Sequence, residues 1–193
     1  KETSYPVAPT LFLEFSGSKA AVQESVAIAK DVIEGEQCTS FQFETDSVEK
    51  AKLWEARHHA AFAIIARYPD KGIMSADVCV PISQLTDALV ETRRIVEKHN
   101  MEAAIFGHVG DGNYHAALPV DHSDPEDIKR VEAVNEQIIN YALSKGGTCT
   151  GEHGVGLGKK QYLQREHESA LPMMKEIKST FDPNNILNPG KIF

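Results

Sequence analysis

The stretch EAAIFGHVGDGNYHAALPV, residues 102–120, decides how the chain folds. Residues 102–109 and 113–120 are apolar and β-prone, which predicts two strands. The Asp111-Gly112 pair between them is favoured in two-residue hairpin turns, because both central positions take positive φ. The sequence therefore predicts an antiparallel hairpin at this point.

The hairpin carries two histidines whose positions follow from the turn. If Gly110 pairs with Asn113, then His108 pairs directly with His115. Their Cβ atoms would lie about 4.5–5.5 Å apart on one face of the sheet. Two imidazoles at that spacing can bind one metal ion, but two polar side chains on a solvent-facing strand would leave the same pattern.

Strands and helices alternate around the hairpin. The pattern predicts an α+β fold of ferredoxin-like type, a mostly antiparallel sheet with helices on one face, because the late hairpin argues against a purely parallel α/β sheet. Other strands are expected over 9–17, 39–45 and 72–81, and helices over 18–35, 46–69, 83–100, 123–147 and around 170–181.

A composition shift toward Gly, Asn, Pro and Lys begins near Gly146. We therefore expect one domain over 1–145 and a C-terminal helical segment over 146–193. The chain opens at Lys1 with a loop-like stretch, which suggests a piece of a longer protein.

The charge and composition exclude some classes of protein. The net charge is −8 and the pI is about 5.5, which argues against a nucleic-acid binder. No apolar run reaches the roughly 20 residues of a membrane span, so no transmembrane segment is expected. Three cysteines without CxxC spacing suggest reduced thiols and an intracellular location.

A third metal ligand is available in TGEHG, residues 150–154. Glu152 and His153 are neighbours in a Gly-flanked loop, so one could bind an ion while the other faces a substrate. Two His and one carboxylate form a common site for zinc or another transition metal with an open position. An ordinary surface loop is the alternative.

Other motifs are less specific. GVGLGKK, residues 154–160, satisfies neither the P-loop nor the dinucleotide pattern. It could still receive an anion at a helix N-terminus, or form a packing turn. Arg57 borders the apolar face of its helix and could either extend to water or bind a carboxylate. Asp77 interrupts an apolar strand, which favours a network or turn residue over a catalyst.

Three motifs in one order resemble a known family: GHVGDGNYH (107–115), GTCTGEHGVGLGK (147–159) and FDPNNILNPGKIF (181–193). The chain resembles the FAD-linked D-2-hydroxyacid dehydrogenases, which include D-lactate dehydrogenase of the cytochrome type, the glycolate oxidase flavin subunit and D-2-hydroxyglutarate dehydrogenase. DVCVPISQL (77–85) and PVAPTLFLEFSGS (6–18) look most similar to the D-lactate dehydrogenase branch.

The resemblance implies that the chain is the substrate-binding cap of a vanillyl-alcohol-oxidase-type flavoprotein. The segment over 146–193 would return to an FAD-binding domain that this sequence does not contain. The resemblance also implies two cofactors, FAD held mainly by that other domain, and a divalent metal, zinc or manganese. The chain alone is expected to be inactive.

Roles for individual residues follow from the same resemblance. His108, His115 and Glu152 would bind the metal, and His153 would be the catalytic residue. Arg57 would hold the substrate carboxylate.

The tail motif aligns Asn188 and Lys191 with residues near the flavin. Where the hydroxyglutarate branch grips a second carboxylate, this chain has only short side chains, which implies a small acid such as D-lactate; they are Ala61, Ser75 and Ala117.

The implied function is the oxidation of a small D-2-hydroxy acid to the 2-oxo acid, with metal-assisted substrate binding. The expected electron acceptor is a cytochrome or an electron-transfer flavoprotein. The expected location is mitochondrial in a eukaryote, and cytoplasmic or peripheral to the inner membrane in a bacterium. Two alternatives remain, a metallohydrolase with a His-His-Glu site and a non-catalytic ferredoxin-like regulatory module.

Overall fold

The computed structural model describes residues 8–36 and 38–193 of the chain. The backbone divides into two compact units, residues 1–63 and 64–193, which are described separately below. Among the described residues, no helix has both the length and the hydropathy that a membrane crossing requires.

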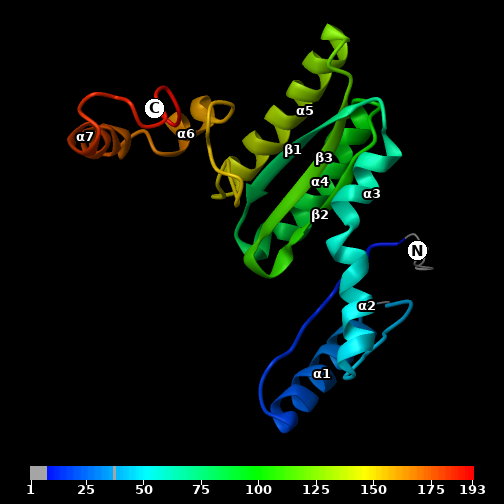
Figure 1. The fold of residues 1–193 in the computed structure, drawn as a ribbon. Helices are drawn as coiled ribbons and strands as arrows, with labels where there is room; N and C mark the ends of the chain where they lie inside the picture. The colour runs from blue at the N-terminus through cyan, green and yellow to red at the C-terminus, as the bar shows by residue number, and fades with distance from the viewer. Residues whose placement is uncertain (1–7, 37) are drawn as a thin grey trace. The chain divides into compact units, whose positions relative to one another are not determined.

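The second unit contains a three-stranded antiparallel sheet, built from β1 (Gly72–Cys79), β2 (Ala104–His108) and β3 (Asn113–Val120). The spatial order is β1-β3-β2, so β3 is central (Figure 1). A short 3-10 turn (η1, Ile82–Gln84) and α4 (Leu85–Lys98) connect β1 to β2. This mixed helix and sheet architecture confirms the predicted fold class.

Helix α5 (Pro125–Ser144) follows β3 and begins at a clear sequence signal. The Asp124 carboxylate accepts a hydrogen bond from the backbone N–H of Glu126, and Pro125 occupies the first turn, where its missing N–H costs nothing. Helices α4 and α5 pack against each other, and α5 packs on the sheet.

The core lies on one face of the sheet, because even-numbered residues of β1 and β3 point to the same side. Val78 pairs with Tyr114, and Ala76 pairs with Ala116. These residues are buried in one apolar cluster with residues of α4 and α5. The Tyr114 hydroxyl lies 3.0 Å from the Thr92 hydroxyl of α4, so both buried polar groups have a partner.

The hairpin is present, but its predicted register is wrong. His108 pairs with Asn113, and His115 pairs with Phe106, because the turn has four residues instead of two. Val109–Asp111 form a 3-10 turn (η2), and Gly112 takes φ 76°. A slip of two residues keeps every side chain on its predicted face. His108 and His115 therefore share one face, but as diagonal neighbours.

After α5 the chain returns to the outer edge of β1 and makes a single antiparallel bridge. Thr148 donates its backbone N–H to the carbonyl of Cys79 over 2.8 Å. A ferredoxin-like sheet has a fourth strand beside its first strand. Here the fourth strand is replaced by one bridge, and residues 150–153 then pack on the face of the sheet.

Two further helices complete this unit, α6 (Lys160–Glu166) and α7 (Leu171–Phe181). The Lys160 ammonium donates to the carbonyl of Gly190 over 2.8 Å, which ties the tail to the start of α6. Asp182 caps the turn after α7 by accepting hydrogen bonds from the backbone of Ile186 and Leu187.

The first unit is helical. The Ser18 hydroxyl caps helix α1 (Lys19–Glu34) by accepting a hydrogen bond from the backbone N–H of Ala21. The helix expected over 46–69 is divided at His59 into α2 (Ser47–His58) and α3 (Ala60–Arg67). No Gly or Pro marks this division. Helix α3 crosses the boundary between the two units.

The strands predicted over 9–17 and 39–45 are wrong. These segments pair with no strand in the described part of the chain. Their alternating apolar residues therefore remain accessible, with Leu11 62% and Leu13 50% exposed. Alternation of apolar and polar residues does not make a strand by itself, because a strand also needs a partner.

The hairpin turn should tolerate substitution at one glycine and not at the other. A Cβ on Gly112 would lie 2.0 Å from the Val80 carbonyl oxygen, at a φ that L-residues disfavour. We expect Gly112→Ala to lower the free energy of unfolding by roughly 2 kcal/mol or more in urea denaturation. Gly110→Ala is the control, because its Cβ would meet nothing within 4 Å. Equal stability of the two variants would contradict this account.

Candidate metal and substrate site

The candidate site lies on the sheet face opposite the core. Asp77 of β1 pairs with His115 of β3, which pairs on its other side with Phe106 of β2. Asp77 and His115 are buried, although the helices cover the other face. The segment after Thr148 provides this cover.

Residues 150–153 pack directly on the sheet. Gly151 is required for this approach, because a Cβ there would lie 1.8 Å from the Asn113 amide nitrogen and 2.6 Å from an Asp77 oxygen. The Asp77 carboxylate accepts hydrogen bonds from the backbone N–H groups of three successive residues; they are Gly151 at 3.0 Å, Glu152 at 3.2 Å and His153 at 3.0 Å. One carboxylate thus fixes the backbone of the loop.

Three further groups surround the same carboxylate. The Asn113 amide donates to it over 3.0 Å, the Thr150 hydroxyl over 3.2 Å and the Lys159 ammonium over 3.3 Å. Burial alone would raise the pKa of Asp77. The His153 backbone N–H, the Asn113 amide and the Lys159 charge outweigh burial and hold this pKa far below its ordinary value. Asp77 is therefore a charged, fully hydrogen-bonded group inside the protein.

The fixed loop brings Glu152 to the two histidines of the hairpin. Its Oε1 atom lies 3.1 Å from Nε2 of His115 and 3.6 Å from Nε2 of His108. One ligand atom of each residue lies within 4.8 Å of the others. The His115 side chain is 4% exposed, while those of His108 and Glu152 are about half exposed, so this group is open on one side.

These three side chains fit a divalent metal ion. Tetrahedral zinc with nitrogen and oxygen ligands at about 2.0–2.2 Å has ligand atoms about 3.3–3.6 Å apart. The two measured separations are close to that range. An open side is also what a metal needs if a substrate is to complete its coordination.

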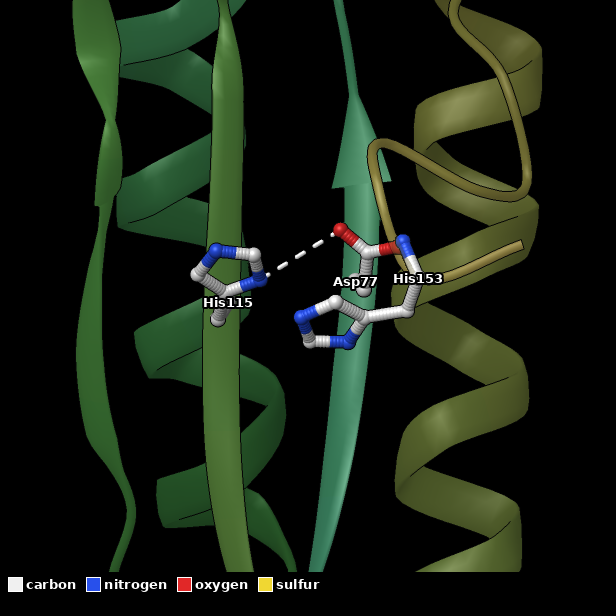
Figure 2. Close-up of side chains that lie close together, drawn as sticks. All are labelled: Asp77, His115 and His153. Atoms are coloured by element: carbon white, nitrogen blue, oxygen red, sulfur yellow. Dashed lines mark hydrogen bonds and ion pairs between the residues drawn. The ribbon is translucent and has the colours of Figure 1, made fainter. Parts of the chain in front are cut away.

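The histidine of the loop, His153, contacts His115 of the hairpin. The rings of His153 and His115 stack with centroids 4.8 Å apart and planes 3° from parallel (Figure 2). Burial lowers the pKa of His115, which favours the neutral imidazole that metals bind. The His153 side chain is about half exposed, so a substrate could reach it.

A second group of possible ligands is Asp77, His115 and His153. The two oxygens of a carboxylate offer about four lone-pair positions. Neighbouring N–H and O–H groups already donate to both Asp77 oxygens. The group of His108, His115 and Glu152 is therefore the better metal site.

Other predicted site residues lie elsewhere. Arg57 is in α2 of the first unit, where its side chain is half-buried. Asn188 and Lys191 are exposed in the C-terminal tail, and the Lys191 ammonium donates to the Asn188 side chain over 3.3 Å. Asn188 adopts φ 48°. The roles assigned to these three residues remain predictions.

Sequence reasoning recognised Asp77 only as a network residue and overlooked Asn113. A signal existed for Asp77, since it is a charged residue between the apolar neighbours Ala76 and Val78, whereas Asn113 follows the turn glycine and carries no such signal. The hydrogen bond between the Asn113 amide and the Asp77 carboxylate depends on the pairing of Cys79 with Asn113. The strands β1 and β3 that pair in this way are separated by more than 30 residues. The hairpin alone therefore gave no indication of this hydrogen bond.

Comparison with known proteins gives a consistent result. The family model described as FAD linked oxidases, C-terminal domain, matches residues 1–192. The chain is 42% identical over 190 residues to the probable mitochondrial D-lactate dehydrogenase of Danio rerio, covering 98% of this chain and 38% of that protein. It is 39% identical to the mitochondrial D-lactate dehydrogenase [cytochrome] of Arabidopsis thaliana, over 96% of this chain and 33% of the relative.

A more distant relative is the glycolate oxidase subunit GlcD of Bacillus subtilis, 34% identical over 95% of this chain and 39% of that protein. The chain thus spans between a third and two fifths of these relatives. Among solved structures, 4-ethylphenol oxidase from Gulosibacter chungangensis matches with a TM-score of 0.62 at 20% identity, over 91% of this chain and 37% of that one. This likeness supports the fold alone.

Proposed function

The chain belongs to the FAD linked oxidases, whose C-terminal domain it represents, and on this premise we propose that the protein oxidises a small D-2-hydroxy acid. The product is the 2-oxo acid, and D-lactate is the proposed substrate. The observation that carries the proposal is the convergence of His108, His115 and Glu152 beside the accessible ring of His153. The D-lactate dehydrogenase relatives support it.

In this proposal His108, His115 and Glu152 hold a divalent ion, zinc or manganese. When bound, such an ion supplies Lewis-acid polarisation of the substrate hydroxyl and orients the acid. The chain contributes a neutral His115 and a carboxylate whose backbone is fixed. The open side of the three ligands leaves room for the substrate.

His153 is the proposed general base. An imidazole titrates near neutral pH and can take the proton of the substrate hydroxyl. Its ring is positioned by two contacts, the stacking on His115 and the hydrogen bond from its backbone N–H to Asp77. Both orient the ring without blocking its outer edge.

FAD would supply the hydride acceptor for the oxidation of the substrate carbon. We propose that residues 1–145 form the substrate-binding cap and that residues 146–193 reach the domain that holds most of the FAD. Asn188 and Lys191 are the proposed contacts of the tail with the flavin region. Both are exposed in the described structure, as such contacts require.

The substrate is proposed to be short. Ser75 and Ala117 pair with each other on the site face of the sheet, one step along from the Asp77 and His115 pair. Neither carries a positive charge that could pair with a second carboxylate, and neither does Ala61 of α3. Arg57 is proposed to bind the single carboxylate through its planar guanidinium.

The proposed electron acceptor is a cytochrome or an electron-transfer flavoprotein. The relatives named mitochondrial support that location in a eukaryote, and a cytoplasmic or membrane-peripheral location is proposed for a bacterium.

If these three side chains bind an ion, the metal content of the protein should depend on each of them. Dialysed full-length protein loaded with zinc or manganese should retain about one ion per chain. Glu152→Gln and His108→Ala should each weaken the ion's binding at least tenfold, because one of three ligands is lost. Glu168→Gln, at an exposed position outside the group, is the control and should bind like the wild type. Wild-type protein without stoichiometric metal would refute the site.

The proposed reaction predicts that D-lactate bleaches the flavin of the full-length protein without oxygen, and that L-lactate does not. His153→Asn should slow the bleaching about 10²–10⁴-fold, the usual contribution of a general base. Stopped-flow absorbance measures both. Hydrolysis of an ester or phosphate by protein whose flavin D-lactate does not reduce would favour the metallohydrolase instead.

The proposed carboxylate contact predicts a defect in substrate binding. Arg57→Met should raise the KM for D-lactate at least tenfold, because a charge-assisted bidentate contact is lost. Arg67→Met is the matched control, since the Arg67 guanidinium pairs with Glu102. Steady-state kinetics with an artificial electron acceptor provide the readout. An unchanged KM in Arg57→Met would remove this residue from the substrate site.

A further inference from the structure

We propose that Asp77 is the positioning residue of the site, whose buried carboxylate holds Glu152 and His115 in ligand geometry without itself binding the ion or the substrate. This inference rests on the proposed function, because it concerns how the same metal site is assembled. It assigns to a residue of β1 control over ligands that come from β3 and from a loop more than 70 residues away.

The first step of the argument concerns the loop. Residues 150–153 belong to no helix or strand, and the backbone N–H groups of Gly151, Glu152 and His153 all point at one carboxylate. A loop without its own ladder takes its conformation from the group that satisfies its donors. The direction of the Glu152 side chain toward the histidines is thus set through Asp77.

The second step concerns His115. Its Nδ1 atom lies 3.3 Å from Oδ1 of Asp77 and its Nε2 atom lies 3.1 Å from Glu152. Nδ1 is buried and makes no hydrogen bond in the described structure, so the Asp77 carboxylate acts on it as a charge at ion-pair distance. A carboxylate beside one ring nitrogen favours the tautomer that leaves the other nitrogen free for a metal. Asp77 therefore orients the ring and the loop together.

The third step excludes a direct role. Asp77 is fully buried, and Lys159, Asn113 and Thr150 close around it in addition to the loop. Its lone pairs are occupied by donors that it would have to release before binding an ion. Lys159 also donates to the Asp77 backbone carbonyl over 2.7 Å, which holds the neutralising charge in place.

The test is Asp77→Asn in the full-length protein. The amide has no charge to pair with Lys159 and only one oxygen, so it cannot accept from both the loop N–H groups and the Asn113 amide as the carboxylate does, and the loop should be held less firmly. We expect zinc affinity, measured by competition with a chelator, to fall roughly 10–100-fold. We also expect faster hydrogen exchange of the amides of residues 151–153, measured without metal.

Two further variants keep the test decisive. Asp127→Asn is the control, because Asp127 is also buried, accepts a backbone hydrogen bond and pairs with Arg130, but it lies beyond the far end of β3. It should lose stability and keep its zinc affinity. Gly151→Ala displaces the loop without removing the buried charge. It should reproduce the Asp77→Asn result, and it decides the matter if Asp77→Asn does not fold.

The outcomes separate this inference from the proposed function. Wild-type zinc affinity and wild-type exchange in Asp77→Asn would overturn the inference, as would an equal loss of affinity in Asp127→Asn. If the wild type binds no metal, the proposed metal site fails, and the exchange rates alone still decide the anchoring role. Loss of protection at residues 151–153 then supports that role, and retained protection overturns it.

Discussion

The structure of the second unit depends on the burial of β3 on both faces, from Asn113 to Val120. One face is apolar and packs with the helices, which is the usual arrangement for an antiparallel sheet. The other face carries polar groups that have been removed from water as well. A buried carboxylate and a buried imidazole are tolerated only with partners, so this second face determines the course of the chain above it.

Lys159, which lies outside the sheet, is one of the partners that the buried Asp77 carboxylate needs. A lone buried carboxylate would take up a proton, whereas the ammonium 3.3 Å from Asp77 favours its charged form. Lys159 also immediately precedes α6, so the start of that helix is joined to the sheet through the same contact. The Gly-rich stretch before it, read from sequence as an anion site or a packing turn, ends in this internal ion pair.

Much of this could be predicted from the sequence. The hairpin, the helix caps and the residues of the candidate metal site follow from local patterns, namely period-two alternation, Ser18 and Asp124 before their helices, and His and Glu flanked by glycine. The hairpin register could not be predicted, because a turn of two residues and a turn of four place the histidines on the same face. The segments over 9–17 and 39–45 could not be predicted correctly either, because alternation does not show whether a segment has a partner strand.

The single bridge between Cys79 and Thr148 has a consequence for how the site came to exist. In a complete four-stranded sheet every second amide after Thr148 would donate to β1, and the extended strand would point the others away from it. Here the ladder stops after one pair, and the amides that follow Thr148 are free to converge on a side chain. The loop of the site thus lies where a fourth strand would continue, and its backbone N–H groups donate to the Asp77 carboxylate and not to a neighbouring strand. Extending the sheet by a few residues would gain regular structure and abolish the loop that carries Glu152 and His153.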